Sequence, residues 1–229
     1  MCENGADMES FDHFGCRPII IASKNGSLKI VTYLLNMGSN TRGCAYNAAK
    51  YGHIDILKFL FDAGVDVNES WDRSSELRPL MAAAENGLCD VVDFLLSKGA
   101  AIELGATSAL TMACKNGHVD IVDRFLQKGC DVNFSPDTPI MAAVSSGNIS
   151  IVDRLIVNGA HFNDSQVFWP AISNSNFEMF SHLLDLGADI NFFYDYKNCE
   201  LAKYHFNYEK PDSVKIANIV YKQCKCGAH

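Results

Sequence analysis

Glycine residues recur along this chain at one fixed interval. Five pairs of glycines stand twelve residues apart: Gly26 and Gly38, Gly52 and Gly64, Gly87 and Gly99, Gly117 and Gly129, and Gly147 and Gly159. Ser175 and Gly187 keep the same interval, with serine in the first place. Self-similarity at a period of about 30 residues is typical of a stacked repeat array, in which no unit can bury its apolar face alone.

The segments around these glycines predict two short helices in each repeat. Proline opens three copies, at Pro18, Pro79 and Pro139, and it is tolerated at the start of a helix because the first N–H groups have no partner there. The first glycine ends one helix by allowing a positive φ. Between the two glycines, apolar residues such as Leu57 and Leu60 recur every three or four positions. They form one stripe of a second helix.

The phrase that closes a repeat carries a family resemblance. It reads Gly64-Val65-Asp66-Val67-Asn68, Gly129-Cys130-Asp131-Val132-Asn133 and Gly187-Ala188-Asp189-Ile190-Asn191. With the proline openings and the Gly-His turns, it resembles the ankyrin repeat, over roughly residues 4 to 191 in six phased copies. The resemblance implies an all-α solenoid of stacked antiparallel helix pairs with short finger loops between them.

The resemblance also predicts the organisation of the chain. We expect residues 1–16 to be the closing phrase and finger of a preceding repeat, 17–191 to form six repeats, 192–223 to form a divergent capping repeat and 224–229 to be a flexible tail. Because no helix pair precedes residues 1–16, here called the leader, the outward face of Pro18–Leu35 is expected to expose apolar surface. Either a longer parent array has been cut, or the leader folds over this face, or a partner covers it. In the capping repeat, Asn198–Phe206 and Ser213–Gln223 are predicted helices, the second capped by Asp212 or Ser213.

The chain departs from the family pattern in the opening turn. The family's histidine is replaced by Ile20, Tyr46, Met81, Thr111, Met141 and Trp169. Only Thr138 keeps the family's threonine. We therefore expect the polar network between neighbouring repeats to be weak or absent. Pro170 falls inside a first helix, which it should shorten or kink.

Composition excludes several classes of function. A net charge of −8 argues against general nucleic-acid binding, which needs a basic face. No apolar stretch is long enough to span a membrane, and the acidic N-terminus lacks the apolar core of a secretion signal. Nine cysteines, an odd number, suit a reducing compartment, so we expect a cytoplasmic protein. The divergent repeats also resemble the degenerate ankyrin proteins of giant DNA viruses, such as mimivirus, which would place the chain in the host cytoplasm.

The cysteines and histidines suggest no enzyme. Cys44, Cys89, Cys114 and Cys130 stand where small residues pack, and His53 and His118 belong to the repeat phrase. The tail Cys224-Lys-Cys226-Gly-Ala-His229 offers three close ligands, whereas structural zinc needs four, and it is a poor prenylation box. A frayed tail is the favoured interpretation, with a metal site or a lipid anchor as alternatives. No catalytic motif appears, so we expect no cofactor and no enzymatic activity.

Binding of a protein partner is the function that the resemblance implies, through the concave groove of first helices and fingers. The exposed pairs before the first glycine are predicted to line it: Lys24-Asn25, Lys50-Tyr51, Glu85-Asn86, Lys115-Asn116, Ser145-Ser146 and Ser173-Asn174. The longest finger, 65–77, carries Trp71, which with Tyr51 would form an aromatic anchor or would pack along its own finger.

Two further hypotheses follow from the resemblance. The chain could recruit substrates to a ubiquitin ligase, as adaptors that join ankyrin arrays to a docking segment do. It could also be a substrate itself, because Asn68, Asn133 and Asn191 resemble the asparagines that are hydroxylated in ankyrin repeats.

Overall fold

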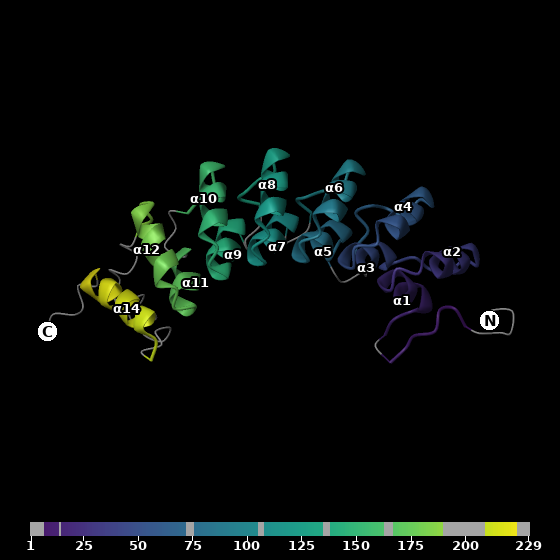
Figure 1. Cartoon of the computed structure of the whole chain (residues 1–229), viewed down its shortest axis with the longest axis horizontal. Helices are drawn as coiled ribbons and strands as arrows, with labels where there is room; N and C mark the ends of the chain where they lie inside the picture. The colour runs from purple at the N-terminus through teal and green to yellow at the C-terminus, as the bar shows by residue number, and fades with distance from the viewer. Residues whose placement is uncertain are drawn as a thin grey trace. The chain divides into compact units, whose positions relative to one another are not determined.

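The computed structural model describes residues 7–13, 15–71, 76–104, 108–134, 138–162, 167–189 and 209–223. These residues form thirteen helices and no strand. The all-α prediction is therefore confirmed. The chain divides into two compact units, Met1–Phe125 and Leu126–His229, and Figure 1 shows the helices of each unit in chain order.

The first unit is built from four helix pairs. The first helices are α1 (Pro18–Lys24), α3 (Cys44–Lys50), α5 (Pro79–Glu85) and α7 (Ala109–Lys115). The second helices are α2 (Leu28–Asn36), α4 (Ile54–Asp62), α6 (Cys89–Ser97) and α8 (Val119–Gln127). First helices pack side by side, α1 on α3, α3 on α5 and α5 on α7, while α2 packs on α4. The unit thus has a layer of first helices and a layer of second helices (Figure 1).

The second unit continues the same pattern. The pair α9 (Pro139–Ser146) and α10 (Ile149–Val157) is followed by α11 (Phe168–Ser173) and α12 (Phe177–Asp185). Helix α14 (Pro211–Gln223) packs on α12. Helix α11 has six residues, whereas the other first helices have seven or eight, which agrees with the shortening expected from Pro170.

The start of α14 corrects one prediction. The helix begins at Pro211, so Asp212 and Ser213 lie in its first turn and neither is the capping residue. Proline suits this position because it lacks the N–H that would have no partner there. The Asp212 carboxylate instead accepts a hydrogen bond from Lys215 at 2.8 Å. The predicted helix Asn198–Phe206 lies outside the described residues.

The recurring glycines end the helices as predicted. Gly26 and Gly87 each have a φ of 71°, in the left-handed region that side chains disfavour. Ser175, which stands in a glycine's place, has a φ of 55° and is the one non-glycine residue with a positive φ in the described part of the chain. The fixed interval therefore records a backbone requirement.

The core follows one register in the second helices. Counting from the first glycine of a repeat, or from Ser175, the residues four, five and eight positions later are buried. They are Ile56, Leu57 and Leu60; Val91, Val92 and Leu95; Ile121, Val122 and Phe125; Ile151, Val152 and Leu155; and Met179, Phe180 and Leu183. Helix α2 buries only Val31 and Leu34, and the side chain four positions after its glycine, Ile30, is 53% exposed. The expectation of exposed apolar surface on this first pair is confirmed.

Hydrogen bonds between repeats correct a second prediction. His53 Nε2 lies 3.0 Å from the carbonyl oxygen of Lys24, and His118 Nε2 lies 3.0 Å from that of Glu85. Each histidine follows a first glycine and reaches the end of the first helix in the preceding repeat. The expectation of weak or absent polar links was wrong, because residues outside the opening turn supply them.

The same histidines explain a second demand on the glycines. A Cβ atom at Gly87 would lie 2.7 Å from Cε1 of His118, whereas a Cβ at Gly99 would have no atom within 4 Å. Both glycines have a positive φ. Gly87 therefore needs to be glycine for its φ and for the room it leaves to the His118 ring, and Gly99 for its φ alone.

We predict that Gly87→Ala destabilises the chain more than Gly99→Ala. Backbone strain should cost about 1–2 kcal/mol in both variants. Gly87→Ala should lose roughly 1–2 kcal/mol more because it displaces the His118 ring and its hydrogen bond. Urea unfolding measures both losses, and a His118→Ala background should remove the excess. Equal losses in the two single variants would contradict this account.

Candidate protein-binding surface

The predicted surface pairs lie at the ends of the first helices. In the first unit they are Lys24-Asn25, Lys50-Tyr51, Glu85-Asn86 and Lys115-Asn116, here called the helix-end row. All of them are exposed except Lys50, which is half-buried. In the second unit, Ser145, Ser146, Ser173 and Asn174 occupy the same places and are also exposed. The carbonyl oxygens of Lys24, Glu85 and Ser145 accept hydrogen bonds from side chains of the next repeat, while their own side chains stay at the surface.

Charge in the helix-end row differs from that of the whole chain. The row holds three lysines, Lys24, Lys50 and Lys115, and one glutamate, Glu85, whereas the chain has a net charge of −8. Each lysine stands in the last turn of its helix, where the helix dipole favours a positive charge. The lysines thus support the helix ends and also give this surface a mildly basic character.

An aromatic cluster joins the row to the longest finger. The rings of Tyr46 and Trp71 meet edge to face, with centroids 5.2 Å apart. Lys24 Nζ lies 5.5 Å from the centroid of Tyr51, and Lys50 Nζ lies 6.0 Å from that of Tyr46. Tyr51 is 43% exposed and Tyr46 is buried. We call Tyr46, Tyr51 and Trp71, with the two lysines, the aromatic patch.

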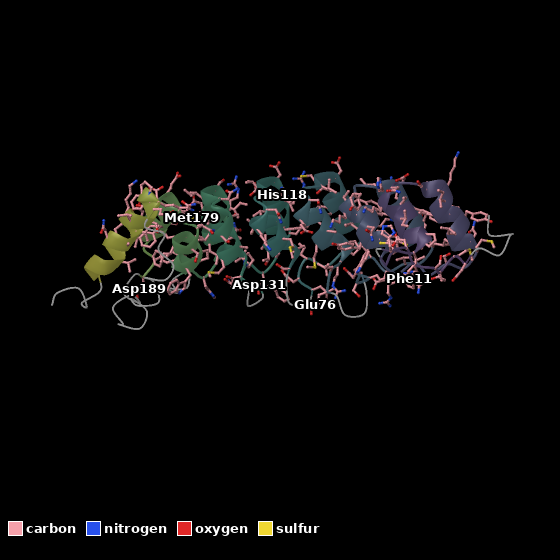
Figure 2. The ribbon with its side chains drawn as sticks, turned by 90° about the horizontal axis from the view of Figure 1, so that it is seen from below. Phe11, Glu76, His118, Asp131, Met179 and Asp189 are labelled. Carbon is pink, nitrogen blue, oxygen red and sulfur yellow. The ribbon has the colours of Figure 1, made fainter. Side chains whose placement is uncertain are left out.

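Tyr51 and Trp71 were predicted to form an aromatic anchor together, but Trp71 contacts the ring of Tyr46. Figure 2 shows Glu76, from the same finger as Trp71, on one edge of the first unit and His118, from a helix-end turn, on the other. Tyr51 also stands in such a turn. Tyr46 interacts with both sides, and its pKa is raised by burial and then by the charges of Glu85 and Tyr51. One hint of this role was present in the sequence, because Tyr46 replaces the histidine that the family has in the opening turn.

The base of the finger holds a partly desolvated carboxylate, that of Glu69. The finger folds back on itself, with the N–H of Trp71 donating to the carbonyl of Leu77 at 2.8 Å. Glu69 is half-buried against Gly43, and its buried Oε2 has no hydrogen-bond partner among the described residues. Burial raises the pKa of Glu69, although the nearby charge of Arg42 opposes this. The ionised carboxylate therefore opposes folding.

The asparagines of the closing phrase link neighbouring repeats. Asn68 Oδ1 accepts from the N–H of Ala101 at 2.9 Å, and Asn133 Oδ1 accepts from the N–H of His161 at 2.8 Å. Asn133 Nδ2 also donates to the carbonyl of Gly159 at 3.0 Å. Asn68 and Asn133 are half-buried, and Asn191 lies outside the described residues. These amides therefore have a structural role.

Comparison with known proteins decides the family. The chain matches the family described as "Ankyrin repeats (3 copies)" over residues 1–70, 44–106, 80–166 and 110–194. The chain belongs to the ankyrin-repeat family. Ankyrin repeats are in general protein–protein interaction modules, and the fold is generally non-enzymatic.

Two known proteins are similar to this ankyrin-repeat chain. The crystal structure of the human ASB11 ankyrin repeat domain is similar with a TM-score of 0.64 and 25% identity, over 76% of this chain and 86% of that one. Alpha-latrotoxin-Lh1a from Latrodectus hasselti is 36% identical over 86 residues, which is 37% of this chain and 6% of the toxin. The chain thus spans a small part of that relative. Neither is viral, so these relatives lend no support to a giant-virus origin.

The described ranges meet neither the requirements for a membrane span nor those for a metal site. None of the helices there is long and apolar enough to cross a membrane. No group of three or more His, Cys, Asp or Glu side chains is arranged there to hold a metal ion. The tail residues Cys224, Cys226 and His229 lie outside these ranges.

We predict that Glu69→Gln raises the melting temperature at pH 7 by about 1–2 °C, a shift of roughly half a kcal/mol in a chain of this size. The pKa of Glu69 is raised in the folded state, so its contribution to stability is fully present below the unfolded value of 4.5 and is lost as pH rises through the folded value. The gain from the variant should therefore vanish near pH 4. Glu76→Gln, at an exposed position of the same finger, also removes one negative charge and is the control. Equal gains at pH 7 from the two variants would contradict this account.

Proposed function

We propose that this chain is a non-catalytic interaction module, and that it binds a partner protein through the helix-end row and the aromatic patch of its first unit. The observation that carries the proposal is the alignment of exposed side chains from four successive repeats, with a half-exposed aromatic ring among them. The lysines of the row favour a partner segment of neutral to acidic character.

Packing of the helix ends supports this proposal. The carbonyl oxygens of Lys24 and Glu85 accept hydrogen bonds from the next repeat, so the backbone that presents these side chains is held in place. A surface that is ordered before binding loses less conformational entropy on association. Tyr51 adds an aromatic side chain, the type that contributes most to interface energy.

Charge reversal tests the row against a matched surface. We predict that Lys24→Glu with Lys115→Glu lowers the affinity for partners captured from cytosolic lysate by about tenfold or more, mainly through slower association. The control is Lys29→Glu with Lys98→Glu, which changes the net charge equally at two exposed positions, one in α2 and one at the end of α6. Equal losses from both double variants would contradict a specific role of the row.

The aromatic patch is tested by separating binding from stability. Tyr51→Ala should weaken binding of the same partner with only a small change in melting temperature, because 43% of the residue is exposed. For Trp71→Ala we also predict weaker binding. This variant should also lower the melting temperature, because it removes the contact of Trp71 with Tyr46. A lower melting temperature with binding retained would assign Trp71 to packing of its finger.

The compartment and the ligase hypothesis belong to the same proposal. Cys16, Cys44 and Cys89 are free thiols, which suits a protein kept in a reducing environment. Burial raises the pKa of Cys44 to about 11, which makes that thiol unreactive. An adaptor for a ubiquitin ligase would hold its substrate on the same partner surface and would bind the ligase through a separate docking segment. Residues 192–208 and 224–229, where such a segment would lie, are outside the described ranges.

Hydroxylation of Asn68, Asn133 and Asn191 is a separate prediction. In Asn68 and Asn133 the amide is engaged with the next repeat, so a modifying enzyme would need that part of the chain to open locally. In oxygen-rich cells, mass spectrometry should find at least one of these peptides heavier by one oxygen atom. Asn158, exposed at the end of α10 and outside a closing phrase, is the control. Unmodified peptides at all three sites would contradict the prediction.

A further inference from the structure

The first helix pair exposes a face that every other pair buries. Ile30 is 53% exposed, while its counterparts Ile56, Val91, Ile121, Ile151 and Met179 are between 0% and 3% exposed. Helix α2 already packs on α4 at its other side. The exposure of Ile30 therefore comes from the side where a preceding repeat would lie.

In three repeats the preceding repeat also contacts a second register position, seven residues after the first glycine or Ser175. The ring of Phe94 is stacked on Phe61 of the preceding repeat at 6.1 Å, with Lys58 Nζ 5.9 Å from its centroid. At the same position in the next repeat, Arg124 Nε bonds the Asp93 carboxylate of the preceding repeat at 3.0 Å.

The second unit repeats this arrangement. His182 stands at the same register position, and its Nε2 lies 2.6 Å from Asp153 Oδ1 of the preceding repeat. In α2 the position belongs to Tyr33, which is 44% exposed. Among the covered residues Phe94 is the one that Tyr33 resembles, because both are aromatic.

The leader already makes the contacts of a closing phrase. The Asp7 carboxylate accepts from the N–H of Glu9 at 2.9 Å, as that of Asp66 accepts from Asn68. Glu9 Oε1 accepts from the N–H of Asn40 at 2.9 Å. This contact matches the one that Asn68 makes with the second residue after the next repeat's closing glycine, Ala101. The leader therefore forms one part of a repeat–repeat interface whose remainder, on α2, is open.

Among the described residues, a hollow also lies between α1 and the leader. The hollow, of about 340 Å³, is lined by Asp12 and Cys16 of the leader and by Ile20, Ile21, Lys24 and Asn25 of α1. Phe11 of the leader is exposed as well and is labelled in Figure 2. First helices pack side by side in this unit, and α1 has such a neighbour, α3, on one side only.

We propose that this N-terminal face, made of Ile30, Tyr33 and the hollow on α1, is a repeat interface that receives an ankyrin-type helix pair joined directly to the leader. The second helix of that pair lays an apolar side chain over Ile30. It places an aromatic and a basic side chain over Tyr33, as Phe61 and Lys58 lie over Phe94. This interface is additional to the partner-binding row, and its test does not depend on any partner.

The chain itself supplies a suitable helix pair for the experiment. A copy of residues 43–63, which includes Lys58 and Phe61, is placed directly before Gly5 in place of residues 1–4, as Ala63 precedes Gly64. We expect the extended chain to melt about 5 °C or more above the original chain and to protect the α2 amides from hydrogen exchange at least tenfold better. A matched extension carrying Phe61→Asp in the copied segment should give a clearly smaller gain.

Ile30→Ala then reports whether the face is covered. In the original chain it should lower the melting temperature by about 1–2 °C, because the side chain is half exposed. In the extended chain it should cost at least about 5 °C, the size expected for a buried isoleucine such as Ile56. The proposal is overturned if the extended chain folds and Ile30→Ala costs no more in it than in the original chain.

A measurement on the original chain keeps the proposal testable even if the extension fails to fold. Ile30→Glu should lower the melting temperature by only about 2–3 °C, slightly more than Ile30→Ala, whereas Ile56→Glu should unfold the chain. A fall of 10 °C or more for Ile30→Glu would show that another part of this chain already covers the face. Concentration-dependent dimers in sedimentation that Ile30→Glu abolishes would assign the face to a second copy. Either result overturns the proposal.

Discussion

Every helix pair in this protein depends on its neighbour to bury its apolar residues. A second helix of nine residues buries three side chains at fixed distances from a glycine, and it cannot shield them within its own repeat. Isolated helices of this length are marginal in water. The contact between repeats is therefore the interaction on which both the helices and their presented side chains depend, and Ile30 shows what one missing neighbour leaves exposed.

The proposed partner surface follows from this arrangement. First helices must approach one another closely, so their flanks carry small residues such as Ala48, Ala83 and Ala113, all buried. The helix ends differ from repeat to repeat, and there Lys24 and Glu85 bond the next repeat through their backbone carbonyls while their side chains stay exposed. A repeat array of this kind keeps its stability and its recognition in separate positions, which is why one scaffold can serve unrelated partners.

The sequence was sufficient for the repeat unit and insufficient for the contacts between units. The glycine interval predicted the helix ends, because that signal is local backbone geometry. The structure adds that Ser175 takes the positive φ of the glycine it replaces. The contact of Trp71 with Tyr46 was missed, because a long finger can fold onto its own base or away from it and spacing does not distinguish the two. The histidine bonds between repeats were also missed, because they depend on how successive repeats are superimposed. The cap of α14 was misplaced by the preference for Asp and Ser over the proline that begins the helix.

The glycine that ends a first helix constrains how the sequence of such a repeat array can evolve. The space above Gly26 and Gly87 is filled by His53 and His118, that above Gly52 by Leu88 and that beside Gly147 by Asn176, each from the following repeat. A glycine and the side chain that covers it belong to different repeats and must stay compatible. The natural unit of duplication, deletion or exchange in this array is therefore the junction between two repeats, and repeats cut at their sequence boundaries are not freely interchangeable modules.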